Sequence, residues 1–238
     1  MNKIICIVGS LNPTSKSLEF AQHLKIRFGE IDKDMEFKII YPNNFHLFQC
    51  NGCLSCFKTG ICPLDIKDDF QWFKNDILSS DLVIFISPVY SLNTTPFIKE
   101  IIDRIIYWSH YLKLARHSFI SITVSLSGNP IVGNYLESVG TALGMRCLSK
   151  INLISHETYQ QKNLEQLEKI VEIIGRYMLL EKKNFYSKEL EVYYQMLKKH
   201  YANPNGFAYD YEKNVWDSSL GKFNSFKQFL EIEGSLQK

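Results

Sequence analysis

Hydrophobic residues along the chain fall into two alternating patterns. Short, nearly continuous apolar runs are typical of parallel strands that are covered on both faces. Between these runs, apolar residues recur every three or four positions, which is typical of amphipathic helices. The runs predict five strands, at Lys3–Val8, Met35–Tyr41, Asp81–Ser87, Ser118–Val124 and about Arg146–Ile154.

Helical patterns separate the predicted strands. Alternating strands and helices predict the α/β class, in which parallel strands carry ligand-binding loops at their carboxyl ends. In the helix expected over residues 66–78, Asp68 lies in the first turn and Leu78 faces inward. In the helix that begins at Pro96, Arg104 lies on the polar side. The predicted helices cover residues 18–28, 66–78, 96–106, 131–143, 164–180, 190–201 and 225–232.

The composition fits one domain with an appendage. The chain has 238 residues, of which 45% are hydrophobic and 22% charged, so it can bury a full core. We assign residues 1–184 to the α/β core. Residues 185–238 are expected to form a helical and irregular extension, with an irregular stretch at 202–223. The aromatic residues of this extension predict packing on the core or on a partner subunit.

The charge and hydropathy of the chain indicate which partners and which cell compartment to expect. The net charge of +2 is spread evenly, so neither nucleic acid nor an anionic membrane is expected as a main partner. The apolar run at the N-terminus is too short for a signal peptide, and no later run is long enough to span a bilayer. These features predict a cytoplasmic protein, in which thiols stay reduced and can bind metals.

The largest cluster of chemically reactive side chains lies between the second strand and the next helix. Cys50, Cys53, Cys56 and Cys62 form a C-x2-C-x2-C-x5-C motif. Spacings of two residues let successive thiolates curve around one centre, as they do in zinc and iron–sulfur sites. The motif therefore predicts a metal centre on this loop.

Four interpretations of the cysteine motif are open. The clustering could be accidental, the thiols could form two disulfides, or they could bind a structural zinc ion or an iron–sulfur cluster. Disulfides require an oxidising compartment, and zinc sites typically use two C-x2-C pairs separated by a longer arm. The C-x2-C-x2-C run is the ferredoxin pattern and favours a [4Fe–4S] cluster.

A hydroxyl-rich turn from Ser10 to Ser17 joins the first strand to its helix. Its hydroxyls and the N–H groups of the helix N-terminus make a site for an anion. The turn matches neither a Walker A loop nor G-x-G-x-x-G. Small hydroxyls suit a terminal monophosphate such as that of flavin mononucleotide (FMN), although Ser and Thr also cap ordinary helices. Two further loops, at 88–96 and 125–130, are expected at the same edge of the sheet.

Together these motifs resemble the NADPH-dependent FMN reductase superfamily, and within it the iron–sulfur flavoproteins. The resemblance covers residues 1 to about 155. It implies a flavodoxin-like fold: a doubly wound, five-stranded parallel sheet of order 2-1-3-4-5, with an FMN-binding domain at 1–184 and a cysteine-rich loop at 49–63. It rests on Gly9-Ser10 with Ser15-x-Ser17, on the four cysteines, and on Ser87-Pro88-Val89-Tyr90 followed by Phe97-x-Lys99 and Asp103-Arg104.

The resemblance also implies which residues contact the cofactors. The turn after the first strand would hold the FMN phosphate, the loop after the third strand would line the isoalloxazine ring, and the four cysteines would ligate a [4Fe–4S] cluster. The segment Leu11-Asn12-Pro13 departs from the family pattern, because relatives often carry an arginine there. The implied FMN-binding residues are Ser10, Asn12, Ser15, Lys16, Ser17, Leu18, Pro88, Val89, Tyr90, Ser91, Leu92, Asn93, Thr94, Ser127 and Gly128.

FMN and a cluster together imply electron transfer between two-electron and one-electron carriers. We expect an FMN-dependent oxidoreductase, an iron–sulfur flavoprotein that receives electrons from NAD(P)H or a ferredoxin-like partner and forms a homodimer or homotetramer as its relatives do. No side chain is assigned as a general acid or base. The alternatives are a cluster-free NAD(P)H-dependent FMN, quinone or azo reductase, and a zinc-stapled, non-catalytic binding protein.

Overall fold

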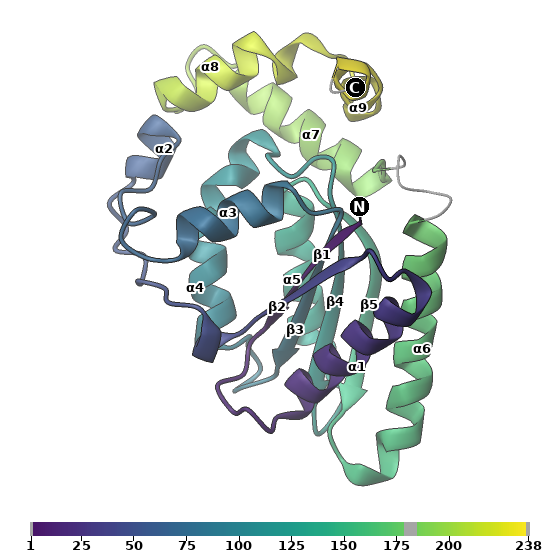
Figure 1. Cartoon of the computed structure of the whole chain (residues 1–238). Coiled ribbons are helices and arrows are strands. Elements are labelled where there is room, and N and C mark those ends of the chain that lie inside the picture. The colour runs from purple at the N-terminus through teal and green to yellow at the C-terminus, as the bar shows by residue number, and fades with distance from the viewer. Residues whose placement is uncertain (1, 179–184, 237–238) are drawn as a thin grey trace.

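Five parallel strands form the centre of the molecule (Figure 1). The structure is a computed structural model that describes residues 2–178 and 185–236. The strands pair in the order β2-β1-β3-β4-β5, which confirms the predicted flavodoxin-like α/β fold and its strand order. The strands are β1 (Lys3–Val8), β2 (Glu36–Ile40), β3 (Leu82–Pro88), β4 (Ser118–Ser125) and β5 (Arg146–Ile154).

Helices cover both faces of the sheet (Figure 1). Because side chains alternate along a strand, Ile5 and Ile7 of β1 pack in one core, and Ile4, Cys6 and Val8 pack in the other. Burial on both faces explains why the strand is a continuous apolar run. The layer beside Ile5 contains α3 (Phe70–Leu78), α4 (Pro96–Ile105) and α5 (Ile131–Ala142), and the layer beside Ile4 contains α1 (Lys16–Ile31) and α6 (Gln160–Arg176).

The last part of the chain forms a C-terminal arm that arches over one end of the sheet (Figure 1). Leu190 and Tyr194 of the arm are fully buried in the same core as α5. The Tyr194 hydroxyl lies within hydrogen-bonding distance of two carbonyl oxygens, 2.6 Å from Leu220 O and 2.9 Å from Phe223 O, and so links α7 to the segment after α8. The predicted domain boundary after residue 184 lies outside the described residues. The arm consists of α7 (Lys188–Tyr201), α8 (Asp210–Ser218) and α9 (Phe226–Leu236).

The stretch 202–223 is not irregular as expected, because it contains helix α8. Two of its residues, Glu212 and Trp216, are four positions apart and both 2% exposed, so they lie on one buried face. Asp210 and Glu212 lie in the first turn, where negative charge favours the helix. The polar composition conceals this short amphipathic pattern.

Three details of the predicted helices are wrong. Helix α3 begins at Phe70, because the Asp68 carboxylate before the helix accepts from the N–H of Phe70, its first residue, and from the N–H of the distant Phe48. Leu78 is 39% exposed, because Ile77 fills the inward position and the next residue points about 100° away. Arg104, expected on the polar side of α4, is 1% exposed because the carboxylates of Asp65 and Asp68, from the segment before α3, pack against it.

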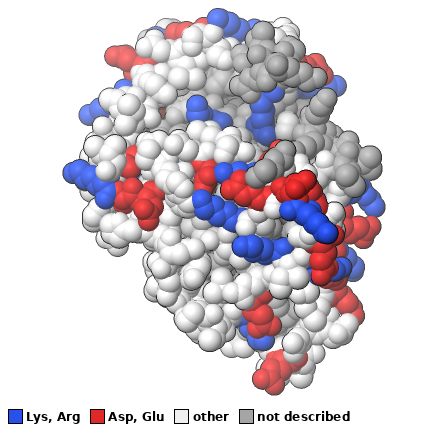
Figure 2. Space-filling view, in the orientation of Figure 1, with Lys and Arg blue, Asp and Glu red and all other residues white. Residues whose placement is uncertain are grey.

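The surface carries both signs of charge. Figure 2 shows acidic and basic side chains beside one another on the face viewed, rather than in separate patches. Across residues 2–178 and 185–236, no helix combines the length and the apolar character that a membrane crossing requires.

One partly buried ion-pair cluster predicts how stability changes with pH. Asp76 of α3 pairs with Lys3 of β1 and Lys38 of β2. Burial alone raises the pKa of Asp76, but the two ammonium groups outweigh it and lower the pKa below its ordinary value. Such a carboxylate stabilises the fold above its unfolded pKa of about 3.9, and this contribution is lost as the pH falls through the lower, folded pKa.

We therefore expect Asp76→Asn to lower the free energy of unfolding at neutral pH, and this loss to be smaller at a pH below about 3.9. Urea unfolding at both pH values measures the difference. Asp34→Asn, at an exposed position after α1, is the matched control and should change neither value. An equal loss for Asp76→Asn at both pH values would contradict the electrostatic explanation.

Candidate functional site

The turn after β1 caps the N-terminus of α1. Ser15 is the N-cap residue, and its Oγ accepts a hydrogen bond from Leu18 N at 3.3 Å. The first N–H groups of a helix have no partner within it, so those of Lys16 and Ser17 can bind an anion. The helix dipole favours negative charge at the same point.

The side chains of this turn differ in how they can contribute to anion binding. Ser10 is 2% exposed, and its Oγ accepts from Asn12 N at 3.3 Å. Lys16 Nζ lies 2.8 Å from Glu19 Oε2. Leu18 is a core residue, 5% exposed, so only its backbone belongs to the turn. The turn therefore offers hydroxyls, amides and one ammonium group, of which the ammonium already has a carboxylate partner.

Gly9 brings this turn against the loop that follows β3. A Cβ at Gly9 would lie 2.3 Å from Thr95 Oγ1 and 2.8 Å from Ile98 Cδ1, so the approach requires glycine. Gly9 N also donates to Ile86 O at 2.9 Å. Within the described residues, Thr95 Oγ1 is buried without a hydrogen-bond partner. An unpaired buried hydroxyl is costly and fits a site in which a bound ligand supplies the partner.

The loop after β3 ends in a tight, strained turn. Tyr90 and Asn93 exchange two backbone hydrogen bonds of 3.0 and 2.9 Å. The central residues, Ser91 and Leu92, have φ values of 50° and 61°. This left-handed backbone costs roughly 1–2 kcal/mol at each non-glycine residue, and such strain concentrates at ligand sites. Tyr90 and Leu92 are 53% and 61% exposed, so the turn presents large side chains at the sheet edge.

The base of the same loop is held firmly. Val89 N donates to Val124 O at 3.0 Å, which extends the pairing beyond Pro88. The hydroxyls of Ser87 and Thr94 lie 2.9 Å apart and both residues are buried. Pro88, Val89 and Thr94 therefore support the loop, and the four-residue turn is its accessible tip.

The loop after β4 completes this edge. Gly128 has a φ of 65°, and its N–H donates to Ser125 Oγ at 2.8 Å. Leu126 and Ser127 are exposed beside it. Because β1, β3 and β4 are neighbours and parallel, the three loops that carry the predicted FMN-binding residues meet at one edge of the sheet.

The four cysteines lie on the loop between β2 and α3, around the short helix α2 (Ser55–Thr59). Cys50 and Cys53 are exposed, Cys56 on α2 is half-buried, and Cys62 is 7% exposed. The loop thus turns two thiols toward solvent and two toward the protein.

The backbone of this loop bends sharply at three points. Gly52, Leu54 and Gly60 have φ values of 68°, 60° and 76°. Cys50 N donates to Glu100 Oε2 of α4 at 3.2 Å, which fixes the start of the motif against the core. The bends and this anchor give the loop a compact path.

The thiols fit a metal centre by their chemistry. All six cysteines are described, and all are free in this structure. Burial, together with the neighbouring Cys62 and Cys50, raises the pKa of Cys56 to about 11. Thiolates are the ligands that iron–sulfur clusters and zinc prefer. In the described part of the chain, however, no three Cys, His, Asp or Glu side chains are close enough to hold a metal ion.

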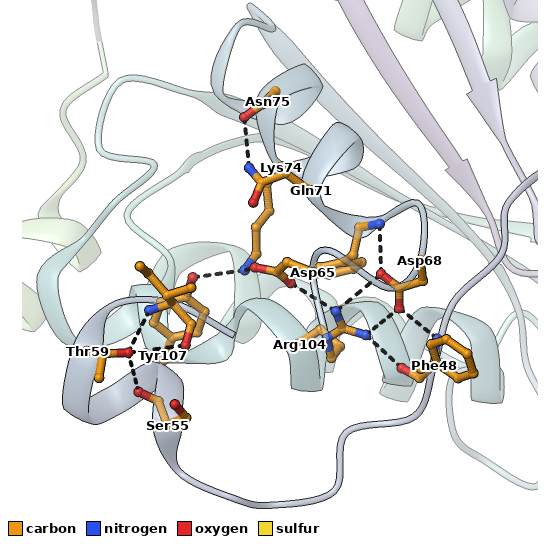
Figure 3. Close-up of polar contacts among 12 residues, drawn as sticks. Phe48, Ser55, Thr59, Asp65, Asp68, Gln71, Lys74, Asn75, Arg104 and Tyr107 are labelled. Atoms are coloured by element: carbon orange, nitrogen blue, oxygen red, sulfur yellow. Dashed lines mark hydrogen bonds and ion pairs between the residues drawn. The ribbon is translucent and has the colours of Figure 1, made fainter. Parts of the chain in front are cut away.

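A buried ion-pair network lies beside the cysteine loop (Figure 3). The Arg104 side chain has no exposed surface and donates to Asp65 Oδ1 at 2.9 Å, to Asp68 Oδ2 at 2.7 Å and to Phe48 O at 2.8 Å. Phe48 precedes the cysteines, and the two aspartates follow them. One guanidinium group therefore joins both ends of the cysteine loop.

The pairing keeps both partners ionised. Burial alone raises the pKa of Asp68, but the Arg104 guanidinium and the N–H groups of Phe48 and Phe70 lower it below its ordinary value. Burial alone lowers the pKa of Arg104, and its two carboxylate partners raise it overall. Asp68 and Arg104 therefore stay charged at neutral pH.

Lys74 of α3 extends the network. Its Nζ donates to Asp65 Oδ2 and, at 2.9 Å, to the Tyr107 hydroxyl. Lys74 is 4% exposed and Tyr107 2%, and burial raises the pKa of Tyr107. Two cations balance two carboxylates, so the buried charges beside the cysteine loop sum to zero.

Sequence reasoning missed this network. It placed Arg104 within a family motif but on the wrong side of α4. One available signal is that Arg104 lies three residues after Ile101 and directly before Ile105, both fully buried. A second is the pair Asp65 and Asp68, which follows the last cysteine at helical spacing although no helix forms there.

The comparison with known families agrees with this geometry. A family model described as NADPH-dependent FMN reductase matches residues 2–160, which include the three loops, the cysteine motif and Arg104. The chain belongs to the NADPH-dependent FMN reductase family. This confirms the superfamily expected from the motifs, and the C-terminal arm lies outside the matched segment.

Two relatives of this FMN reductase family member are iron–sulfur flavoproteins. One, from Archaeoglobus fulgidus, is 31% identical over 104 residues, which are 43% of this chain and 46% of that protein. Another, from Clostridioides difficile, is 40% identical over 55 residues, which are 23% of this chain and 24% of that protein. These matches support the expected iron–sulfur flavoprotein branch, and they span less than half of each relative.

Solved structures of an azoreductase and of a flavoenzyme share the fold. An azoreductase from Bacillus anthracis str. Sterne has a TM-score of 0.54 at 15% identity and covers 74% of this chain and 98% of its own. The flavoenzyme FerB, an NAD(P)H:(acceptor) oxidoreductase from Paracoccus denitrificans, has a TM-score of 0.52 at 17% identity and covers 74% and 97%. At these identities the likeness establishes the fold alone.

Proposed function

We propose that the protein is a flavin-dependent oxidoreductase that binds FMN at the carboxyl ends of β1, β3 and β4. The observation that carries this proposal is that three loops meet at one edge of the sheet. There Gly9 allows the turn after β1 to contact Thr95. Family membership supports the same cofactor. When bound, FMN supplies both hydride transfer and single-electron transfer.

The chain's own residues bind and orient the cofactor in this proposal. The hydroxyls of Ser10, Ser15 and Ser17 and the first amides of α1 hold the phosphate. The Tyr90–Asn93 turn and the Ser127-Gly128 backbone would hold the isoalloxazine ring. The strained φ values at the centre of the turn fix its shape before the cofactor arrives.

We further propose that Cys50, Cys53, Cys56 and Cys62 hold a [4Fe–4S] cluster. Four thiolates on one loop are a suitable donor set, and relatives that match this chain are named iron–sulfur flavoproteins. A cluster supplies single-electron transfer, so NAD(P)H or a ferredoxin-like partner is the proposed electron donor and a homo-oligomer the proposed assembly. The Arg104 network supports the proposal because it ties the two ends of the loop.

A cluster-free NAD(P)H-dependent flavin, quinone or azo reductase is the second candidate. The observation that favours it is the spacing of the thiols, which leaves the described residues without a closed metal site. In that case the loops at the sheet edge carry the whole activity, and the cysteines are structural.

Cysteine substitutions separate the two candidates. Cys53→Ser and Cys56→Ser are each expected to abolish iron binding while FMN content stays unchanged, because the two sites use different loops. Cys147→Ser, on β5 and outside the motif, is the control and should keep all of its iron.

The measurement is iron, sulfide, zinc and FMN content together with the absorption spectrum, on protein purified without oxygen. We expect about four irons per unaltered chain. Iron that persists in both motif variants would refute the cysteine assignment. Flavin without iron in the unaltered chain would refute the cluster and leave the simple reductase.

A further inference from the structure

Helix α8 of the C-terminal arm packs on α2, the helix that carries Cys56; the two helices lie side by side in Figure 1. Gly60 closes α2 in the left-handed conformation. A Cβ at Gly60 would lie 2.3 Å from Tyr211 Cζ and 2.6 Å from its hydroxyl. The Tyr211 ring is therefore in contact with the backbone at the end of α2, and it also packs edge-on against Tyr111, with ring centroids 5.8 Å apart.

A second aromatic contact holds the other side of α2. Phe57, the residue after Cys56, packs between the core and the arm. Its ring centroid is 4.9 Å from that of His110 and 6.3 Å from that of Tyr107, both from the segment after α4. The Tyr209 ring of the arm lies 6.3 Å away from Phe57. The arm thus contacts α2 through Tyr209 as well as Tyr211.

Helix α8 is itself fixed to the rest of the molecule. Glu212, 2% exposed, has Oε1 2.7 Å from His110 Nδ1 and accepts from the Tyr201 hydroxyl at 3.3 Å. Trp216 Nε1 donates to His110 O at 2.8 Å, and its ring stacks on Tyr201 with centroids 5.2 Å apart. These hydrogen bonds fix the buried face of α8. They thereby hold Tyr209 and Tyr211, at the start of α8, in contact with α2.

We propose that the C-terminal arm is a clamp on the cysteine loop, with Tyr211 and Tyr209 as positioning residues for Cys56 and Cys62. The Arg104 network fixes the two ends of the loop, and α8 fixes its middle. The use of this clamp, to hold thiolates for a cluster, rests on the function proposed above. The arm lies outside the segment matched by the family model.

Thiol labelling of the metal-free chain tests the clamp without any cluster. The chain is treated with iodoacetamide, and the modified cysteines are quantified by mass spectrometry. We expect Tyr211→Ala to speed the labelling of Cys56 and Cys62 about tenfold, because local opening of α2 becomes easier. Cys6, fully buried in β1, labels only when the whole domain opens and should not change.

Two variants control for a general loosening of the arm. Phe229→Ala removes an aromatic ring from α9, where it contacts Phe223 and Phe226, and should leave the labelling of Cys56 unchanged. Tyr211→Phe keeps the ring on Gly60 and should behave as the unaltered chain. Unchanged labelling in Tyr211→Ala, or an equal rise in Phe229→Ala, would overturn the clamp.

Two further readouts keep the test decisive. If Tyr211→Ala also exposes Cys6, the milder Tyr209→Ala takes its place, with a smaller rise at Cys56 expected and no rise overturning the clamp. In iron-loaded protein, Tyr211→Ala should lose its cluster absorbance several-fold faster than Phe229→Ala. An unaltered chain that takes up no iron, together with faster labelling in Tyr211→Ala, would refute the cluster and leave the clamp standing.

Discussion

Arg104→Met is expected to lower the free energy of unfolding by about 3–5 kcal/mol. Methionine fills much of the same space, but it leaves the carboxylates of Asp65 and Asp68 without the guanidinium group. Both carboxylates are nearly inaccessible to water, with 4% and 0% of their side chains exposed. Phe48 O also loses its donor. Urea unfolding followed by tryptophan fluorescence measures the loss.

The control is an arginine that forms ion pairs at the surface. Arg27 of α1 pairs with Glu168 and Glu30, and its side chain is 39% exposed. Exposed pairs contribute roughly 0–1 kcal/mol, so Arg27→Met should cost little. Similar losses in the two variants would mean that burial does not set the strength of the Arg104 network.

Gly9→Ala is expected to weaken FMN binding about 5- to 150-fold, the factor that corresponds to an overpacking cost of about 1–3 kcal/mol. The added methyl group would meet Thr95 Oγ1 and Ile98 Cδ1, so the turn after β1 and the loop after β3 must separate. The two ends of the proposed FMN site then no longer fit one ligand. Titration of FMN into the flavin-free protein, followed by quenching of flavin fluorescence, measures the affinity.

Gly29→Ala is the matched substitution for this experiment. Gly29 lies near the end of α1, and a Cβ there would meet nothing within 4 Å. Alanine in a helix is more favourable than glycine by roughly 0.5–1 kcal/mol, so this variant should be slightly more stable and bind FMN as before. Gly9→Ala with unaltered FMN affinity would place the cofactor elsewhere.

The sheet could be predicted from sequence because its signal is local. A strand buried on both faces, such as Lys3–Val8, is a continuous apolar run, and five such runs separated by helical patterns leave few topologies. Helix α8 was missed because only two of its residues, Glu212 and Trp216, are buried and one of them is charged. Its burial depends on His110, which is distant in sequence.

The candidate site also has parts that local sequence patterns predict and parts that they do not. The three loops follow directly from the ends of predicted strands, because parallel strands present their carboxyl ends at one edge. The network of Arg104, Asp65 and Asp68 depends on partners up to 56 residues apart, and no local pattern reveals such pairing. The start of α3 was placed too early for the same reason, since Asp68 lies before the helix, where it pairs with the distant Arg104 and also accepts from the N–H of Phe70.

Helix α4 sets the distance between the two proposed redox centres. Thr95, at its N-cap, contacts the turn after β1, and Arg104, near its other end, binds both ends of the cysteine loop. Nine residues of α-helix span about 14 Å and cannot stretch. One inserted residue would swing Arg104 by about 100° away from its carboxylates. The length of this helix therefore fixes the distance between the turn after β1 and the cysteine loop.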